Sequence, residues 1–222
     1  MNTLKRIYEY EVGMESMIAK GHVATFRFSS LADFVSQLIT ALLEDIDIKS
    51  KNYKKPALAN LFSLNNLHYI IKGIKGTKLA EAAGQKLIAD MEKAIKKQID
   101  MYRGSWMPLI TVLVDETKIS DKGKIVTVLS KQQRDVIKEK FKTFNKDFEE
   151  ICTAQMKYAI PDVALRLQVI NEVKAILLPM YNRFYDRYTA SDNDFSKNPE
   201  KYIKFTKEQL SATMDKFFDA SN

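Results

Sequence analysis

Apolar residues recur every three or four positions along most of the chain, which is the spacing of helices with one buried face. The first clear run covers residues 31–46 and follows Ser30, which forms a helix-capping pattern with Asp33. Pro56 is expected to open a second helix that reaches about residue 75, because proline is favoured at the first helical position. Alternation of apolar and polar residues persists nowhere, although residues 124–129 could form a short extended piece. Helices are therefore the expected elements.

The remainder of the chain continues this pattern. A third helix is predicted over residues 79–102, with a break near Gly104 and a helical pattern beyond it over residues 106–114. Ser130 and Gln133 form a capping box before a long helix, a second long helix follows residues 160–162, and a last one begins at Thr206. The two long helices carry stripes expected in the core: Ile137, Phe141, Phe144, Phe148 and Ile151 in one, and Ile170, Val173, Leu177, Met180, Phe184 and Tyr188 in the other.

This succession predicts an all-α fold of stacked antiparallel helical bundles that form the end of an elongated rod. Residues 115–124 are expected to be a loop and supply the best internal boundary. We therefore expect one helical bundle over residues 1–115 and a C-terminal helical bundle over residues 116–222. With 222 residues, 45% hydrophobic content and only 7 glycines and 5 prolines, the composition suits long helices around a packed core.

The charge balance points to an anionic partner. A net charge of +7 favours polyanions such as nucleic acid or anionic lipid. The last part of the chain is not basic overall, because from Arg183 onward seven basic residues face seven acidic ones, so any anion site there must be local. No run approaches the roughly 20 apolar residues that cross a bilayer, and residues 1–8 lack a signal-peptide core.

Catalytic and metal-binding patterns are absent from the sequence. His22 and His68 have no partners at metal-ligand spacing, and no glycine-rich phosphate loop or nucleophile elbow occurs. The single cysteine, Cys152, is expected to fill the core, and the adjacent Glu149 and Glu150 are expected on different helix faces in solvent. The chain is therefore expected to be no enzyme and to need no cofactor.

Lysines are the remaining candidates for a binding site. Lys201 and Lys204 stand three residues apart among apolar neighbours, a spacing that would place two ammonium groups on one side over an apolar base. Lys138, Lys140 and Lys142 form a second group that would spread over more than half the circumference of a helix. A solvated polar face is the other interpretation of such a charge run.

Four segments resemble the C-terminal part of the family of exocyst complex component seven. They are NNLHYI at residues 65–70, FKTFNKDFEE at 141–150, PMYNRFY at 179–185 and NPEKYIKFT at 198–206. The resemblance implies a segment of a helical rod from a subunit of the complex that tethers secretory vesicles for exocytosis. It also implies that the chain is a piece of a longer protein, cytoplasmic and peripheral at the inner face of the plasma membrane.

The resemblance further implies binding of phosphatidylinositol 4,5-bisphosphate through Lys201 and Lys204, with Lys138, Lys140 and Lys142 as a second tier. Other exocyst subunits, Rho-family GTPases and the actin-nucleating Arp complex are implied partners without residues assigned to them. The alternative is a helical scaffold for protein–protein assembly without direct lipid binding. Nucleic-acid binding is not expected, because the charge is its only support and no docking motif accompanies it.

Overall fold

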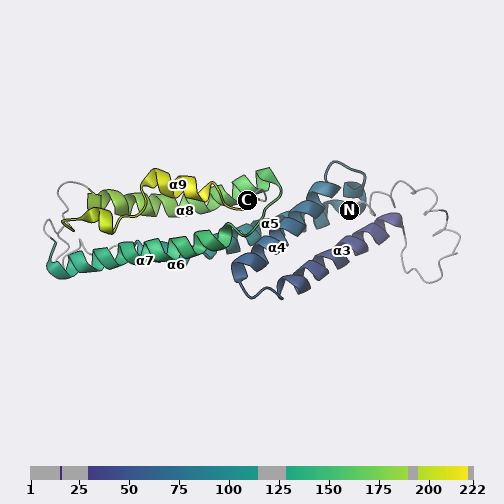
Figure 1. The fold of residues 1–222 in the computed structure, drawn as a ribbon. Helices are drawn as coiled ribbons and strands as arrows, with labels where there is room; N and C mark the ends of the chain where they lie inside the picture. Colours follow the sequence, from purple (N-terminus) through teal and green to yellow (C-terminus); the bar gives the residue numbers. More distant parts are fainter. Residues whose placement is uncertain (1–15, 17–29, 115–128, 190–194, 220–222) are drawn as a thin grey trace, which may run out of the picture. The chain divides into compact units, whose positions relative to one another are not determined.

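The computed structural model describes residues 30–114, 129–189 and 195–219, together with residue 16. Every regular element in these ranges is a helix, which confirms the predicted all-α class (Figure 1). The elements are α3 (Leu31–Ser50), α4 (Pro56–Ile74), α5 (Leu79–Gly104), α6 (Met107–Val112), α7 (Lys131–Gln155), α8 (Val163–Thr189), the 3₁₀ turn η1 (Pro199–Lys201) and α9 (Lys207–Met214). The chain divides into two compact units between Tyr102 and Arg103.

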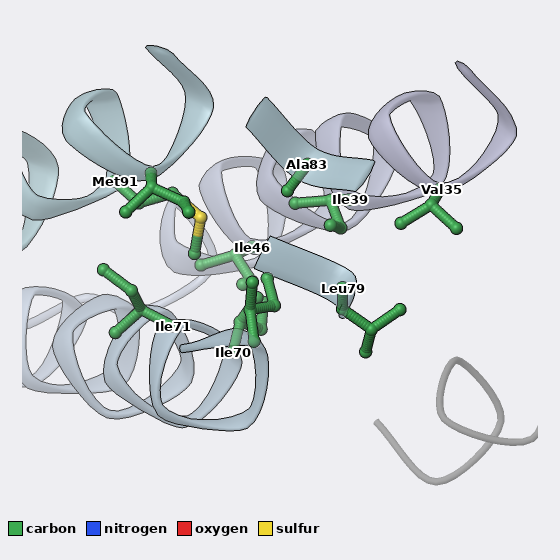
Figure 2. Close-up of a cluster of buried hydrophobic side chains, with 10 residues drawn as sticks. Val35, Ile39, Ile46, Ile70, Ile71, Leu79, Ala83 and Met91 are labelled. Atoms are coloured by element: carbon green, nitrogen blue, oxygen red, sulfur yellow. The ribbon is translucent and has the colours of Figure 1, made fainter. Parts of the chain in front are cut away.

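The first unit is built from α3, α4 and most of α5. Ser30 caps α3 as predicted, since its hydroxyl accepts a hydrogen bond from the backbone N–H of Asp33 at 3.1 Å. Pro56 occupies the first turn of α4, also as predicted. The core lies where the apolar faces of the three helices meet (Figure 2). It contains Val35, Ile39, Ile46, Ile70, Ile71, Ile74, Leu79, Ala83, Ile88 and Met91.

Helix α5 is interrupted at a position that the sequence pattern did not reveal. Gly84 has φ 77° and ψ 151°, a conformation that side-chain-bearing residues rarely adopt, so the helix breaks there and resumes. The predicted break near Gly104 is confirmed, because α5 ends at this residue and α6 begins at Met107. The helical pattern of residues 79–112 is thus divided twice rather than once.

The second unit is centred on α7 and α8, which run antiparallel. Phe141 packs on Phe184 with ring centroids 4.8 Å apart, and Phe144 packs on Tyr181 at 4.9 Å, so later positions of α7 meet earlier positions of α8. Helix α6 packs against both long helices, and α9 packs against α8. The predicted stripe of α7 is buried from Ile137 to Phe148 and half-buried at Ile151.

Some predictions fall outside the described residues. These are the loop over 115–124, the extended piece over 124–129 and the character of residues 1–8. The domain boundary between residues 115 and 116 also lies at this gap and stays a prediction. Within the described residues, α6 packs in the second compact unit, although the predicted ranges place it with the first bundle.

Candidate functional site

The candidate lysines of α7 are held by a well-anchored helix. Ser130 and Gln133 complete the predicted capping box, with the hydroxyl of Ser130 accepting from the Gln133 N–H at 3.2 Å and the Gln133 side chain accepting from the Ser130 N–H at 2.8 Å. The buried stripe of phenylalanines fixes which side of α7 faces the core. The lysines between these positions consequently lie at the surface of the second unit.

Tyr202 fastens the segment that carries Lys201 and Lys204 to α7. Its backbone carbonyl accepts a hydrogen bond from Nδ2 of Asn145 at 2.7 Å, and its N–H donates to the carbonyl of Pro199 at 2.9 Å. Its ring meets the buried ring of Phe195 edge-on, with centroids 6.0 Å apart. Tyr202 is therefore held both through its backbone and through its side chain.

Two lysines of the second tier reach the same tyrosine ring. The ammonium groups of Lys138 and Lys142 lie 5.9 and 5.7 Å from the ring centroid of Tyr202, within cation–π distance. Each also has a carboxylate partner, Asp135 for Lys138 at 3.0 Å and Glu139 for Lys142 at 2.6 Å. The hydrogen bond and the charge of Glu139 raise the pKa of Lys142 above its ordinary value, so this lysine stays charged across the physiological pH range.

Lys204 lies across a groove from α7. Its ammonium group forms an ion pair with Glu149, and both side chains are about half exposed. The groove is also lined by Lys142, Lys146 and Glu150. Glu149 is thus partly exposed to solvent, and it also forms an ion pair with a lysine from a distant part of the sequence, which the sequence did not predict.

Lys201 and Lys140 differ from the other three candidates. Lys201 is exposed at the end of η1, and none of the described carboxylates lies within ion-pair distance of its ammonium group. Lys140 turns away from Tyr202 and donates a hydrogen bond to the carbonyl of Val114. The structure thus brings Lys138 and Lys142 to the ring of Tyr202, places Lys142 and Lys204 on one groove, and leaves Lys140 apart.

The described residues offer no clear alternative site for catalysis, metal binding or membrane insertion. Burial raises the pKa of the Cys152 thiol to about 12, so this half-buried side chain is protonated at neutral pH and is a poor nucleophile. Among the residues that the structure describes, no cluster of three His, Cys, Asp or Glu side chains could hold a metal ion. No described helix is both long and apolar enough to cross a bilayer.

Comparison with known proteins identifies the family. A family model for the C-terminal part of the Exo70 exocyst complex subunit matches residues 1–216. The chain belongs to the Exo70 family. The resemblance seen in the four sequence segments is thereby confirmed, and a family of complex subunits agrees with the prediction that the chain is not an enzyme.

Relatives from animals and a plant have similar sequences. Exocyst complex component 7 of Drosophila melanogaster is 35% identical over 199 residues, which are 86% of this chain and 27% of the fly protein. The Homo sapiens protein of the same name is 31% identical, over 93% of this chain and 28% of its own length. EXO70A1 of Arabidopsis thaliana is 28% identical, over 100% of this chain and 35% of its own length. The chain therefore spans about a third or less of these relatives.

Solved Exo70 structures share the fold. A structure of Exo70 from S. cerevisiae superposes with a TM-score of 0.61 at 29% identity, covering 76% of this chain and 30% of the yeast chain. A second structure of the yeast exocyst component gives a TM-score of 0.57 at 26% identity, covering 76% of this chain and 28% of that one. Both agree with the all-α class expected from the sequence.

Sequence reasoning missed three residues that shape this Exo70 surface. Lys146 follows Lys142 by four positions on α7 and lines the same groove, a spacing that would have marked it as a third lysine on one helix face. Asn145 and Glu149 gave no such signal, because their partners Tyr202 and Lys204 lie far along the chain.

Proposed function

We propose that this Exo70-family chain is part of a vesicle-tethering exocyst subunit and that it binds phosphatidylinositol 4,5-bisphosphate at the inner face of the plasma membrane. The bisphosphorylated headgroup would meet the lysines around Tyr202. Lys201 and Lys204 would be primary contacts, with Lys138 and Lys142 in support. Exo70-family membership supports the role in exocytosis.

One observation carries the proposal of lipid binding. Tyr202 is in contact with the ammonium groups of Lys138 and Lys142, and it directly follows the exposed Lys201. Basic residues from two distant segments therefore meet at one place, although this part of the chain has no net basic excess. Such a local cluster suits a small, multiply charged headgroup better than an extended polyanion.

The geometry does not support all five lysines equally. Lys140 donates to the Val114 carbonyl on another part of the surface, so we expect its removal to affect lipid binding least. Lys204 is the better-placed member of the primary pair for a groove ligand but carries a carboxylate partner, whereas Lys201 is open to solvent. Removing both should weaken binding more than removing either.

Liposome co-sedimentation tests the proposal. Each lysine near an anionic leaflet contributes about 1 kcal/mol, so Lys201→Ala with Lys204→Ala should cost about 2 kcal/mol, or roughly 30-fold in affinity for vesicles containing the bisphosphorylated lipid. The matched control is Lys157→Ala with Lys216→Ala, which removes the same charge from exposed positions beyond the ends of α7 and α9. Equal pelleting of the wild type and both double variants would remove Lys201 and Lys204 from the site.

A helical scaffold for protein–protein assembly without direct lipid binding is the second candidate. The carboxylates that pair with Lys138, Lys142 and Lys204 favour it, because they lower the net positive charge that this surface offers to an anionic lipid. A chain that ignores anionic vesicles but captures another exocyst subunit would establish this role. Rho-family GTPases and the actin-nucleating Arp complex are further predicted partners, and binding to nucleic acid is not expected.

A further inference from the structure

A groove on the second unit collects lysines and carboxylates in nearly equal number. It runs between the outer face of α7 and the segment before α9, and its charged lining consists of Lys142, Lys146, Glu149, Glu150 and Lys204. Lys142 and Lys146 are four residues apart on α7, so one helical turn separates them on the same face. Lys204 faces them from the other wall.

Each lysine of the groove has a carboxylate partner supplied by α7. Glu149 pairs with Lys204, Glu150 lies 3.9 Å from Lys146, and Glu139, outside the groove lining, pairs with Lys142 at 2.6 Å. All of these side chains are between about two-fifths and three-quarters exposed. Exposed ion pairs of this kind add little to stability and are screened by salt, so a stronger anion can replace the carboxylate.

We infer that the groove is a seat for one phosphate of an inositol lipid headgroup, and that Glu149 is the internal counter-ion which this phosphate replaces on Lys204. The inference deepens the proposed function and rests on it. It adds Lys146 as a contact and makes Glu149 a residue that determines which anions bind.

Charge decides which anion can displace Glu149. A phosphomonoester carries about −1.5 to −2 charge and three acceptor oxygens at neutral pH. On Lys204 it would replace a carboxylate of charge −1, while Lys142 and Lys146 line the same groove. The headgroup of phosphatidylserine brings a single net charge, so exchanging it for the Glu149 carboxylate gains little. Glu149 should therefore make the groove select a phosphomonoester over the abundant singly charged lipids.

Neutralising the counter-ion should strengthen binding. Glu149→Gln keeps the size of the side chain and frees Lys204, so we expect about fivefold tighter binding to vesicles containing phosphatidylinositol 4,5-bisphosphate, the gain of roughly one additional lysine. The gain should disappear when Lys204→Ala is added, because the freed lysine is then missing. Asp215→Asn is the matched control: it removes one negative charge and frees Lys174, which lies outside the groove.

The soluble headgroup, inositol 1,4,5-trisphosphate, separates this inference from the proposed function. Titration by calorimetry should show binding to the wild type, tighter binding to Glu149→Gln and weaker binding to Lys146→Ala. Soluble headgroup bound in this order without any binding to vesicles would overturn the proposed membrane role and leave the phosphate seat standing. Vesicle binding with no gain in Glu149→Gln, or with the same gain in Asp215→Asn or in the Lys204→Ala background, would overturn the role of Glu149.

Discussion

The hydrogen bond between Asn145 and Tyr202 offers a way to move the lysine cluster without changing its charge. Asn145→Ala removes the amide that holds the Tyr202 carbonyl at 2.7 Å and leaves every lysine in place. A neutral hydrogen bond contributes about 1 kcal/mol net, and a carbonyl left without its donor adds to the loss. Both residues are half-buried, and the total loss of stability should be about 1–2 kcal/mol.

Two measurements follow from this single substitution. For a chain of this length, 1 kcal/mol corresponds to about 2–4 °C in melting temperature, so thermal unfolding followed by circular dichroism should show a decrease of a few degrees. Co-sedimentation should show a several-fold loss of binding to bisphosphorylated lipid, because the segment that carries Lys201 and Lys204 is no longer fastened to α7 through Tyr202. The expected loss is smaller than that for removal of the two primary lysines.

The control is Asn171→Ala, which removes an exposed asparagine from α8. It should leave lipid binding unchanged and raise stability by roughly 0.5 kcal/mol, the gain in helix propensity that Asn145→Ala also receives. If Asn145→Ala melts at the wild-type temperature and pellets with vesicles like the wild type, the amide does not position this segment and the reasoning is refuted. A loss of stability with unchanged lipid binding would refute only the link from position to function.

Three further predictions concern the fold. Gly84→Ala should destabilise the protein by about 1–3 kcal/mol in urea unfolding, since a Cβ there meets no atom but the positive φ is strained, whereas Gly104→Ala, which has equal space and no positive φ, should not destabilise it. Phe144→Ala should cost about 3–5 kcal/mol in the same assay, because its ring is fully buried. Cys152, with its pKa raised to about 12, should resist labelling by maleimide at pH 7–8 until the chain is denatured, and equal labelling of native and denatured protein would contradict this protection. Because the unfolded thiol ionises near pH 8.5 and the native thiol does not, the free energy of unfolding should also fall progressively above that pH.

Local signals account for what the sequence predicted correctly. The capping box of Ser130 and Gln133 depends on residues three positions apart, and the structure contains it; α9 also begins directly after Thr206, as predicted. The register of α8 was harder, because Met180 and Tyr181 are adjacent and both suit an apolar stripe. The structure buries Tyr181, whose ring packs on Phe144 and whose hydroxyl donates to the carbonyl of Phe205, and leaves Met180 partly exposed. Helical spacing cannot choose between them without knowledge of the opposite helix.

The sequence predicted which lysines belong to the candidate site, but not which distant residues they contact. Lys138 and Lys142 were found because basic residues stand out in a sequence, and their contact with the Tyr202 ring depends on how a distant segment folds back on α7. The same holds for Glu149, which has no mark in the sequence and owes its place to Lys204. The break at Gly84 was missed because a glycine within a helical pattern is compatible with both an intact and an interrupted helix.

The only tryptophan of the chain lies in the second unit, close to the last turn of the described residues. Trp106 precedes α6, is buried, and lies 5.9 Å from the ring of Phe217 in the final turn of the described residues. That turn is also hydrogen-bonded to the connection between α7 and α8, since the N–H of Ile160 donates to the carbonyl of Phe218 at 3.1 Å. With excitation selective for tryptophan, the emission of this one indole therefore reports docking of the C-terminal turn, and Phe217→Ala should shift it to longer wavelength. Exo70 biochemists gain an intrinsic optical probe of this unit that needs no label.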